Sequence, residues 1–298
     1  MNRIQSGIKG KIPPMDTYKN LVSVGELEKL IDRSACRIVD CRFDLMQPDK
    51  GRDDYAEAHI PGAVYAHLDR DLASEITSDS GRHPLPTPAD FNRLLTSWGI
   101  EEGCQVVVYD YANGATAARL WWMMRWIGHD NVAVLNGGIQ AWQQAGLSLS
   151  SEVPELEPVP FAMQPNSAMI ATTAEIAGEI DSELSTVLID ARDRARFQGT
   201  TEPIDTVAGH IPGAVNLPFP ETINADGTWL SLPELSELWQ ETIGEGAAAP
   251  VVAMCGSGVT ACHLLLTAHL LDLTPPRLYV GSWSEWIRAA DRPIASGS

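Results

Sequence analysis

The chain has 298 residues, of which 44% are hydrophobic and 20% are charged, and its formal net charge is −18 at pH 7. This length suits two domains of ordinary size, and no apolar run approaches the length of a membrane helix. The strong negative charge argues against binding to nucleic acid or to an anionic membrane. Residues 1–16 lack the apolar core of a secretory signal, so no signal peptide is predicted.

The first half of the chain alternates helical patterns with short apolar segments. Ser23 followed by Glu26 forms a capping box, which favours the start of a helix. Thr87 followed by Pro88 is a second helix start. Short apolar strands that alternate with helices predict a mainly parallel sheet with helices on both faces. The predicted helices cover residues 26–31, 88–98, 115–126 and 138–145, and the predicted strands cover residues 37–40, 63–65, 106–109 and 132–135.

The second half of the chain repeats the landmarks of the first half in the same order. The clearest is the sequence HIPGAV, which stands at residues 59–64 and again at residues 210–215. Such ordered self-similarity indicates two copies of one domain. The other matched segments are 23–26 with 172–175, 38–42 with 188–192, 106–110 with 250–255, and 135–142 with 279–286.

A segment between the two copies reads as a linker. Residues 147–169 are rich in proline, serine and glutamate and show no periodic pattern. We therefore expect an N-terminal domain at residues 1–146, a linker at residues 147–169 and a C-terminal domain at residues 170–298.

One cysteine lies in a loop suited to negative charge. Cys255 follows an apolar strand pattern at residues 250–254 and precedes a helical pattern at residues 259–271. Unpaired N–H groups and the helix dipole favour an anion at such a strand-to-helix turn. Glycines on both sides of Ser257 allow the backbone to form an anion-binding nest. A thiol placed there should ionise easily, which makes Cys255 a candidate nucleophile.

The other cysteines give no sign of a disulfide framework or a metal site. The total of five cysteines is odd and no CxxC pair occurs, which indicates a reducing compartment such as the cytoplasm. Cysteines of this kind are usually small buried hydrophobic residues. The seven histidines are scattered without ligand spacing, so no metal site is predicted. The five cysteines are Cys36, Cys41, Cys104, Cys255 and Cys262.

Taken together, these motifs resemble the tandem-domain rhodanese-like sulfurtransferases, which include 3-mercaptopyruvate and thiosulfate sulfurtransferases. The resemblance rests on the repeated HIPGAV, on WWM at residues 121–123, on NGG at residues 136–138 and on CGSGVTA from Cys255, and it extends over residues 22–294. It implies an α/β fold of two rhodanese-like domains, each a mainly parallel sheet flanked by helices. It also implies that only the second domain is catalytic. Asp110 agrees with this, because it stands at the position equivalent to Cys255 and cannot carry a sulfane sulfur.

The resemblance further implies a two-step transfer of sulfur without a metal or organic cofactor. Cys255 would take sulfur from a small anionic donor, become a persulfide, and pass the sulfur to an acceptor. The backbone of Gly256, Gly258, Val259 and Thr260 would stabilise the anionic sulfur. Cyanide, a small thiol, thioredoxin or another protein could serve as the acceptor.

The loop also resembles the form found in 3-mercaptopyruvate sulfurtransferases, because it lacks the basic residues of thiosulfate-preferring relatives. The 3-mercaptopyruvate sulfurtransferases use a serine two residues after the cysteine to transfer protons, together with a histidine and an aspartate of the N-terminal half. Ser257 matches the serine. The resemblance suggests His59 for the histidine and Asp53 for the aspartate, with Asp54 as an alternative. A purely structural role for His59, in the turn before Pro-Gly, is equally compatible with the sequence.

The donor carboxylate requires arginine, and here the chain departs from the family pattern. Arg196 matches the first arginine of the family, but Ile204 stands where a second is expected. Arg192 or Arg194 would have to replace it, so thiosulfate remains an alternative donor. A persulfide carrier or redox-sensing module without fast turnover is another alternative. A phosphatase on the same fold is disfavoured, because its phosphate-binding arginine would stand at Ala261.

Overall fold

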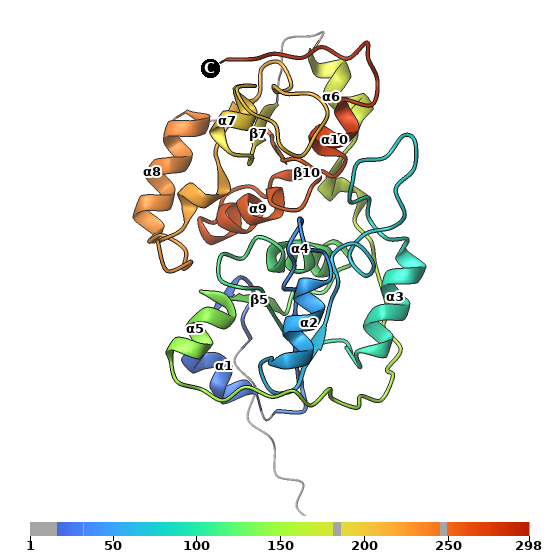
Figure 1. Ribbon diagram of the computed structural model, residues 1–298, viewed down its shortest axis with the longest axis vertical. Helices are drawn as coiled ribbons and strands as arrows, with labels where there is room; N and C mark the ends of the chain where they lie inside the picture. Colours follow the sequence, from blue (N-terminus) through green and yellow to red (C-terminus); the bar gives the residue numbers. More distant parts are fainter. Residues whose placement is uncertain (1–16, 32, 181–185, 245–248, 298) are drawn as a thin grey trace, which may run out of the picture.

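The computed structural model describes residues 17–31, 33–180, 186–244 and 249–297, which form two similar halves stacked on each other (Figure 1). Each half contains a five-stranded sheet whose neighbouring strands are all parallel. The strand order is β1-β5-β4-β2-β3 in the first sheet and β6-β10-β9-β7-β8 in the second, so the two sheets have the same topology. This confirms the predicted fold class. The strands are β1 (Leu21–Val22), β2 (Cys36–Asp40), β3 (Ala63–Tyr65), β4 (Gln105–Tyr109), β5 (Val132–Leu135), β6 (Ile170–Ala171), β7 (Val187–Asp190), β8 (Val215–Asn216), β9 (Val251–Met254) and β10 (Arg277–Tyr279).

Helices cover both faces of each sheet, because alternate strand residues point to opposite sides. In the first sheet, Val106 and Val108 pack with α3 and α4, whereas Val107 and Tyr109 pack with α1 and α5. In the second sheet, α8 and α9 cover one face, and α6 and α10 cover the other. The helices are α1 (Val24–Leu30), α2 (Lys50–Glu57), α3 (Pro88–Ser97), α4 (Ala117–Trp126), α5 (Gly138–Gln144), α6 (Thr173–Ile180), α7 (Arg194–Phe197), α8 (Leu232–Ile243), α9 (Ala261–Leu270) and α10 (Ser282–Trp286), with 3-10 turns η1 (Ser167–Met169) and η2 (Phe219–Thr222).

The two halves meet through α4 and α9, which lie side by side in the middle of the molecule (Figure 1). Both helices are buried along almost their whole length. The inner faces of the two sheets and these helices belong to one hydrophobic cluster, which includes Trp121, Trp122, Leu264 and Leu265. The halves are therefore joined by a common core.

Most of the predicted elements are present, with ends that differ by a few residues. The capping boxes of Ser23 with Glu26 and of Thr172 with Glu175 both form. The helix α2 was not predicted, because its sequence is mostly polar and buries only Gly51 and Tyr55.

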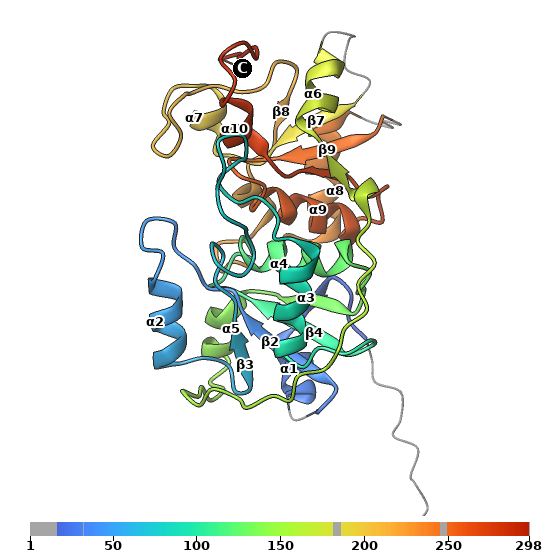
Figure 2. The ribbon, with the colours of Figure 1, turned by 90° about the vertical axis from the view of Figure 1, so that its right-hand side faces the viewer.

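Two irregular segments span the halves: one is the linker of the chain, and the other is a loop of the first half that packs on the second half. Residues 147–166 run along the side of the first half, where Asn92 donates to the carbonyl oxygen of Phe161 (2.7 Å) (Figure 2). Residues 66–87 leave the first half and reach α10 of the second half (Figures 1 and 2). There the backbone is so close that a Cβ on residue 81 would lie 2.5 Å from the carbonyl oxygen of Gly281. The second segment therefore brings side chains of the first half to the second.

In the part of the chain that the structure describes, no helix combines the length and the apolar character needed to cross a membrane.

Candidate functional site

Cys255 lies directly after β9, and α9 begins shortly afterwards at Ala261. Its backbone is fixed on both sides, because its N–H donates to Ser282 Oγ (3.1 Å) and its carbonyl oxygen accepts from Trp283 (3.0 Å). The residue is only 2% exposed. Among the described residues, the backbone N–H groups of residues 256–261 have no hydrogen-bond acceptor. A run of unpaired N–H groups beside a thiol at a helix N-terminus favours a negative charge.

The loop can take this shape only with glycine at position 258. Gly258 has φ of +74°, in the left-handed region. A Cβ at this position would also overlap the carbonyl oxygen of Val280. Glycine is required for both reasons.

The corresponding loop of the first half shows what such N–H groups bind. Asp110 stands directly after β4, as Cys255 stands after β9. Its buried carboxylate accepts hydrogen bonds from the N–H groups of Gly114 (3.0 Å), Thr116 (3.0 Å) and Ala117 (3.2 Å). The first half thus fills its own anion site with a side chain, whereas the corresponding N–H groups of the second half find no acceptor in the part of the chain that the structure describes.

Ser257 belongs to a hydrogen-bonded chain that crosses between the halves. Its Oγ lies 2.7 Å from Nδ1 of His83, and Nε2 of the same ring lies 3.0 Å from Oδ1 of Asp69. Because a carboxylate only accepts, Nε2 carries the proton toward Asp69, and in the neutral ring Nδ1 accepts from the Ser257 hydroxyl. Burial lowers the pKa of His83, and Asp69 opposes that shift. The hydrogen bond from His83 lowers the pKa of Asp69. A neutral imidazole between a serine and a carboxylate can transfer protons.

The prediction that His59 and Asp53 serve Ser257 is wrong in this structure. The His59 ring lies 2.7 Å from the carbonyl oxygen of Tyr55 and 3.1 Å from that of Glu152, and it stacks on the Tyr55 ring. Asp53 is exposed on α2 and pairs with Arg52, while the alternative, Asp54, pairs with Lys50. These side chains are held within or beside the first half, away from the cysteine loop.

The internal repeat indicates a structural role for His59, because the second half has a histidine at the equivalent position. His210 occupies the same place in the second half, where it contacts the carbonyl oxygen of Phe197 (2.8 Å) and stacks on its ring. The two histidines are therefore a structural feature of both copies. His83 and Asp69 come from the irregular segment 66–87, and the only sequence signal for them is that long irregular segments often carry functional groups.

Two arginines lie beside the cysteine loop, one from each half. Measured from the position that a Cβ on Gly256 would take, Nη2 of Arg82 is 2.9 Å away and Nη2 of Arg196 is 3.5 Å away. Asp205 pairs with both guanidinium groups, and its contact with Arg196 is 2.9 Å long. Arg196 also pairs with Glu202 (2.9 Å). Burial raises the pKa of Asp205, while Arg82 opposes that rise.

Arg192 and Arg194 do not replace the arginine that Ile204 lacks. The Arg192 side chain is 1% exposed and is held by Asp190 (2.6 Å) and by the carbonyl oxygen of Gly209 (2.7 Å). Arg42 and Asp40 form the same pair in the first half, so this is another repeated structural feature. Arg194 forms an exposed pair with Glu221. The prediction that Arg192 binds the donor is therefore corrected: its guanidinium is not available.

A buried arginine of the first half, Arg119, holds the cysteine loop through hydrogen bonds. Arg119, on α4, is fully buried and donates to the carbonyl oxygens of Gly258 (3.0 Å), His83 (3.0 Å) and Leu72 (3.3 Å). It has no carboxylate partner among the described residues. Burial lowers its pKa, and interaction with Cys262 and Cys255 opposes that shift. Arg119 thus ties the cysteine loop to the segment that carries His83.

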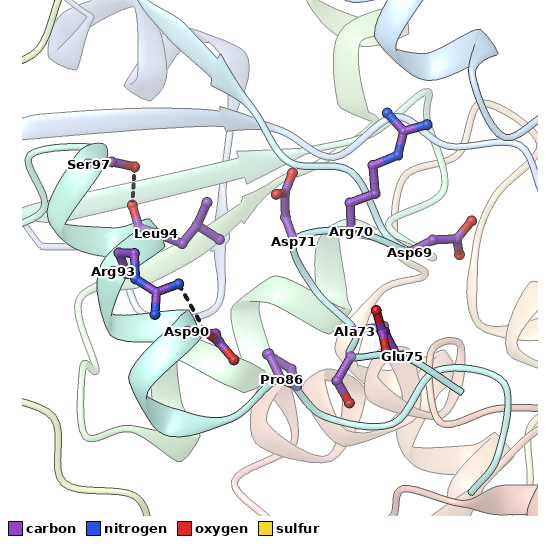
Figure 3. A pocket seen from close by; sticks show the side chains of 11 residues that line it. Asp69, Arg70, Asp71, Ala73, Glu75, Pro86, Asp90, Arg93, Leu94 and Ser97 are labelled. Atoms are coloured by element: carbon purple, nitrogen blue, oxygen red, sulfur yellow. Dashed lines mark hydrogen bonds and ion pairs between the residues drawn. The ribbon is translucent and has the colours of Figure 1, made fainter. Parts of the chain in front are cut away.

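A surface cavity of about 900 Å³ lies at the outer end of the hydrogen-bonded chain (Figure 3). Asp69 lines it together with Asp71, Glu75 and Asp90, whereas no residue of the cysteine loop does. Arg93 and Asp90, one turn apart on α3, form an ion pair beside the cavity (Figure 3). The cavity is therefore separate from the face of the loop that holds Cys255. No cluster of His, Cys, Asp and Glu suited to a metal ion occurs in the described parts of the chain.

Comparison with known proteins agrees with this architecture. The model of the rhodanese-like domain matches residues 23–145 and 172–289. A Pseudomonas aeruginosa protein named "Probable 3-mercaptopyruvate sulfurtransferase" is 41% identical over 279 residues, which cover 93% of this chain and 98% of that protein. The 3-mercaptopyruvate sulfurtransferase of Rattus norvegicus is 40% identical over 261 residues, covering 85% and 86%.

A solved structure is also similar. The crystal structure of SseA from Escherichia coli, described as a 3-mercaptopyruvate sulfotransferase, superimposes with a TM-score of 0.79 at 31% identity and covers 90% of this chain and 100% of that one. With the duplicated parallel sheets and the cysteine loop, these matches show that the chain belongs to the rhodanese-like family, as one of its tandem-domain sulfurtransferases.

Proposed function

We propose that this protein is a 3-mercaptopyruvate sulfurtransferase in which Cys255 carries the sulfur as a persulfide. The observation that carries the proposal is the thiol of Cys255 beside backbone N–H groups 256–261, which have no acceptor among the described residues. Asp110 supports this interpretation, because the same loop of the first half binds a carboxylate with its N–H groups. Preset dipoles of this kind stabilise a thiolate and then a persulfide anion.

In the first step, the Cys255 thiolate attacks the sulfur of 3-mercaptopyruvate. A sulfur–sulfur bond forms while the carbon–sulfur bond of the donor breaks. The electron pair of the broken bond stays on carbon, so that the enolate of pyruvate leaves and must be protonated. In the second step, a thiol or cyanide attacks the outer sulfur, and the Cys255 thiolate returns.

The chain of Ser257, His83 and Asp69 fits the proton transfer that the first step requires. The Ser257 hydroxyl can give its proton to the enolate carbon and regain one that derives from the donor thiol. His83 would hold the proton in between, oriented by Asp69 at 3.0 Å. We therefore assign a proton-transfer role to these three residues, in place of His59 and Asp53.

This arrangement favours 3-mercaptopyruvate over thiosulfate. Thiosulfate releases sulfite, which is stable as an anion at neutral pH and needs no proton from the enzyme. In addition, Arg82 and Arg196 are matched by Glu202 and Asp205, so the cluster offers little net positive charge to a dianion. The names of the two relatives described above, from Pseudomonas aeruginosa and Rattus norvegicus, support the same donor.

Steady-state transfer to cyanide with each donor tests the proposal, with Cys255→Ser as the blank. We expect a higher kcat/KM with 3-mercaptopyruvate and complete loss of transfer in the variant. A preference for thiosulfate would overturn the donor assignment. Stoichiometric sulfur uptake without turnover would instead identify a persulfide carrier.

We also propose that the first domain, residues 1–146, carries no sulfur, that residues 147–169 act as the linker, and that residues 170–298 form the catalytic domain. The filled loop at Asp110 supports this division. Intact-mass analysis after incubation with donor should find one added sulfur atom, at Cys255. All five cysteines are free thiols, which suits a reducing compartment such as the cytoplasm and an acceptor such as thioredoxin.

A further inference from the structure

Arg119 of α4 is a buried cation for which the described parts of the chain supply no carboxylate partner. Its side chain is fully buried, and its guanidinium donates to the backbone carbonyl oxygens of Gly258 (3.0 Å), His83 (3.0 Å) and Leu72 (3.3 Å). Its buried Nε has no hydrogen-bond partner among the same residues. A buried charge is costly unless an opposite charge compensates it. A negative charge near Arg119 is therefore strongly favoured.

The two other arginines beside the cysteine loop differ from Arg119, because carboxylates compensate them. Arg82 and Arg196 both pair with Asp205, and Arg196 also pairs with Glu202. The opposite charges of such pairs largely cancel at the distance of the loop sulfur. Within the described residues, Arg119 is thus the cation near this loop whose charge is left over.

The ionisable groups that oppose the burial of the Arg119 guanidinium are two thiols, Cys262 and Cys255. Burial raises the pKa of Cys262 to about 12, so that thiol is neutral at pH 7. Burial also lowers the pKa of His83, and Arg119 contributes to the lowering, so this imidazole adds no positive charge. Cys255 lies beside the N–H groups of residues 256–261, which favour a negative charge. The sulfur of Cys255 is therefore the group that can supply the missing charge.

We propose that Arg119 is the counter-cation of the Cys255 sulfur, so that the first domain supplies part of the charge that favours the thiolate and then the persulfide anion. Arg119 is a positioning residue: it holds the carbonyl oxygen of Gly258, three residues after the nucleophile, and its field acts in a buried region where charges are weakly screened. The inference rests on the proposed function for the persulfide. A cation that favours the thiolate can be measured without any sulfur donor.

Alkylation by iodoacetamide provides that measurement. The reagent is uncharged, so the ratio of its rate at Cys255 at pH 7 to its rate at pH 10 reports how much thiolate is present at pH 7. A substitution that only displaces the loop lowers both rates and cancels in the ratio. Peptide mass spectrometry with fragmentation assigns the label to Cys255 and separates it from Cys262.

Two substitutions separate the charge of Arg119 from its hydrogen bonds. Arg119→Gln loses the charge but keeps N–H donors, whereas Arg119→Lys keeps the charge but cannot reach the three carbonyl oxygens in the same way. We expect the ratio to fall about 10-fold or more in Arg119→Gln and to stay within about 3-fold of the wild type in Arg119→Lys. An unchanged ratio in Arg119→Gln, or an equal fall in both variants, would overturn the inference.

Arg37→Gln is the matched control, because the guanidinium of Arg37 also donates to three backbone carbonyl oxygens. These belong to Ser34 (2.7 Å), Cys36 (3.0 Å) and Trp98 (3.1 Å), all in the first half. The ratio at Cys255 should stay within about 3-fold of the wild type in this variant. A fall equal to that of Arg119→Gln would show that the effect is not specific to Arg119 and would overturn the inference.

Stability gives a second readout, which begins from the chain with Arg119 intact. Cys255→Asp places a permanent negative charge where the thiolate would be, and Cys255→Asn has nearly the same shape without the charge. We expect a higher urea midpoint for Cys255→Asp, and a smaller difference between the two when Arg119→Gln is added. A lower midpoint for Cys255→Asp would overturn the inference even if Arg119→Gln did not fold.

The outcomes also separate this inference from the proposed function. If the wild type used neither sulfur donor, an alkylation ratio that depends on the charge of Arg119 would still support the counter-cation while the proposed function failed. Sulfur transfer from 3-mercaptopyruvate, combined with a ratio that does not depend on Arg119, would overturn the inference alone.

Discussion

Replacing Gly258 with alanine should damage both folding and catalysis. Its φ of +74° costs about 1–2 kcal/mol for a residue that has a Cβ. The new Cβ would also overlap the carbonyl oxygen of Val280 and lie 3.2 Å from its carbonyl carbon. These are backbone atoms that cannot rotate away, and overpacking of this kind costs about 1–3 kcal/mol. We expect the free energy of unfolding to fall by about 2–5 kcal/mol in total.

The same substitution should slow sulfur transfer, because relief of the overlap must move the loop. Arg119 holds the carbonyl oxygen of Gly258 at 3.0 Å, so a shift there also disturbs the contact to the His83 segment. A displacement of about 1 Å in a catalytic group can cost about 100-fold in rate. We expect a loss of that order in kcat/KM for 3-mercaptopyruvate.

Urea unfolding and steady-state kinetics of Gly258→Ala and Gly62→Ala together measure both effects. Gly62 has φ of +78° but open space around its Cβ position, so it isolates the conformational cost. Gly62→Ala should lose only about 1–2 kcal/mol and keep its activity. If Gly258→Ala were no less stable than Gly62→Ala and transferred sulfur at the wild-type rate, the loop would not require the geometry described.

Three further predictions concern single side chains. Ser257→Ala should lower kcat with 3-mercaptopyruvate by about 100-fold or more, whereas cleavage of thiosulfate, which needs no proton, should change far less; equal losses would contradict the proton-transfer role. Asp110→Ala leaves three N–H groups unpaired and should lower the free energy of unfolding by about 2–4 kcal/mol, measured in urea against Asp110→Asn as the milder variant. Burial lowers the pKa of His263 to about 3, so below pH 6.5 the unfolded chain binds a proton that the folded protein does not. The free energy of unfolding should then fall by about 1.4 kcal/mol per pH unit between pH 6 and pH 4, and His263→Gln should remove that part of the slope.

The fold could be predicted from sequence because its signals are local. The capping boxes, the short apolar strands and the repeated HIPGAV each depend on neighbouring residues. The helix α2 lacked such a signal, since only Gly51 and Tyr55 are buried in it. Its position is determined by packing on the finished sheet.

The candidate site was predictable where one continuous segment builds it, and at Arg196, which the resemblance to the family marked. Cys255 and Ser257 share a loop whose glycines and following helix are visible in the sequence. His83, Asp69 and Arg82 come from a segment without any periodic pattern, and they reach the loop because Gly81 packs on the backbone of Gly281. Contacts between residues so far apart in the chain depend on the docking of the two halves, which no local pattern encodes.

The hydrophobic cluster shared by the two halves determines how this duplicated chain unfolds. Two copies of one domain with separate cores would unfold independently, but here α4 and α9 pack on each other across the two copies. Separating the two halves would expose Trp121 and Leu265 to water, because both side chains belong to the core that the halves share. We therefore expect the two copies to unfold together in a single transition, so that a substitution in the core of either copy lowers the stability of both.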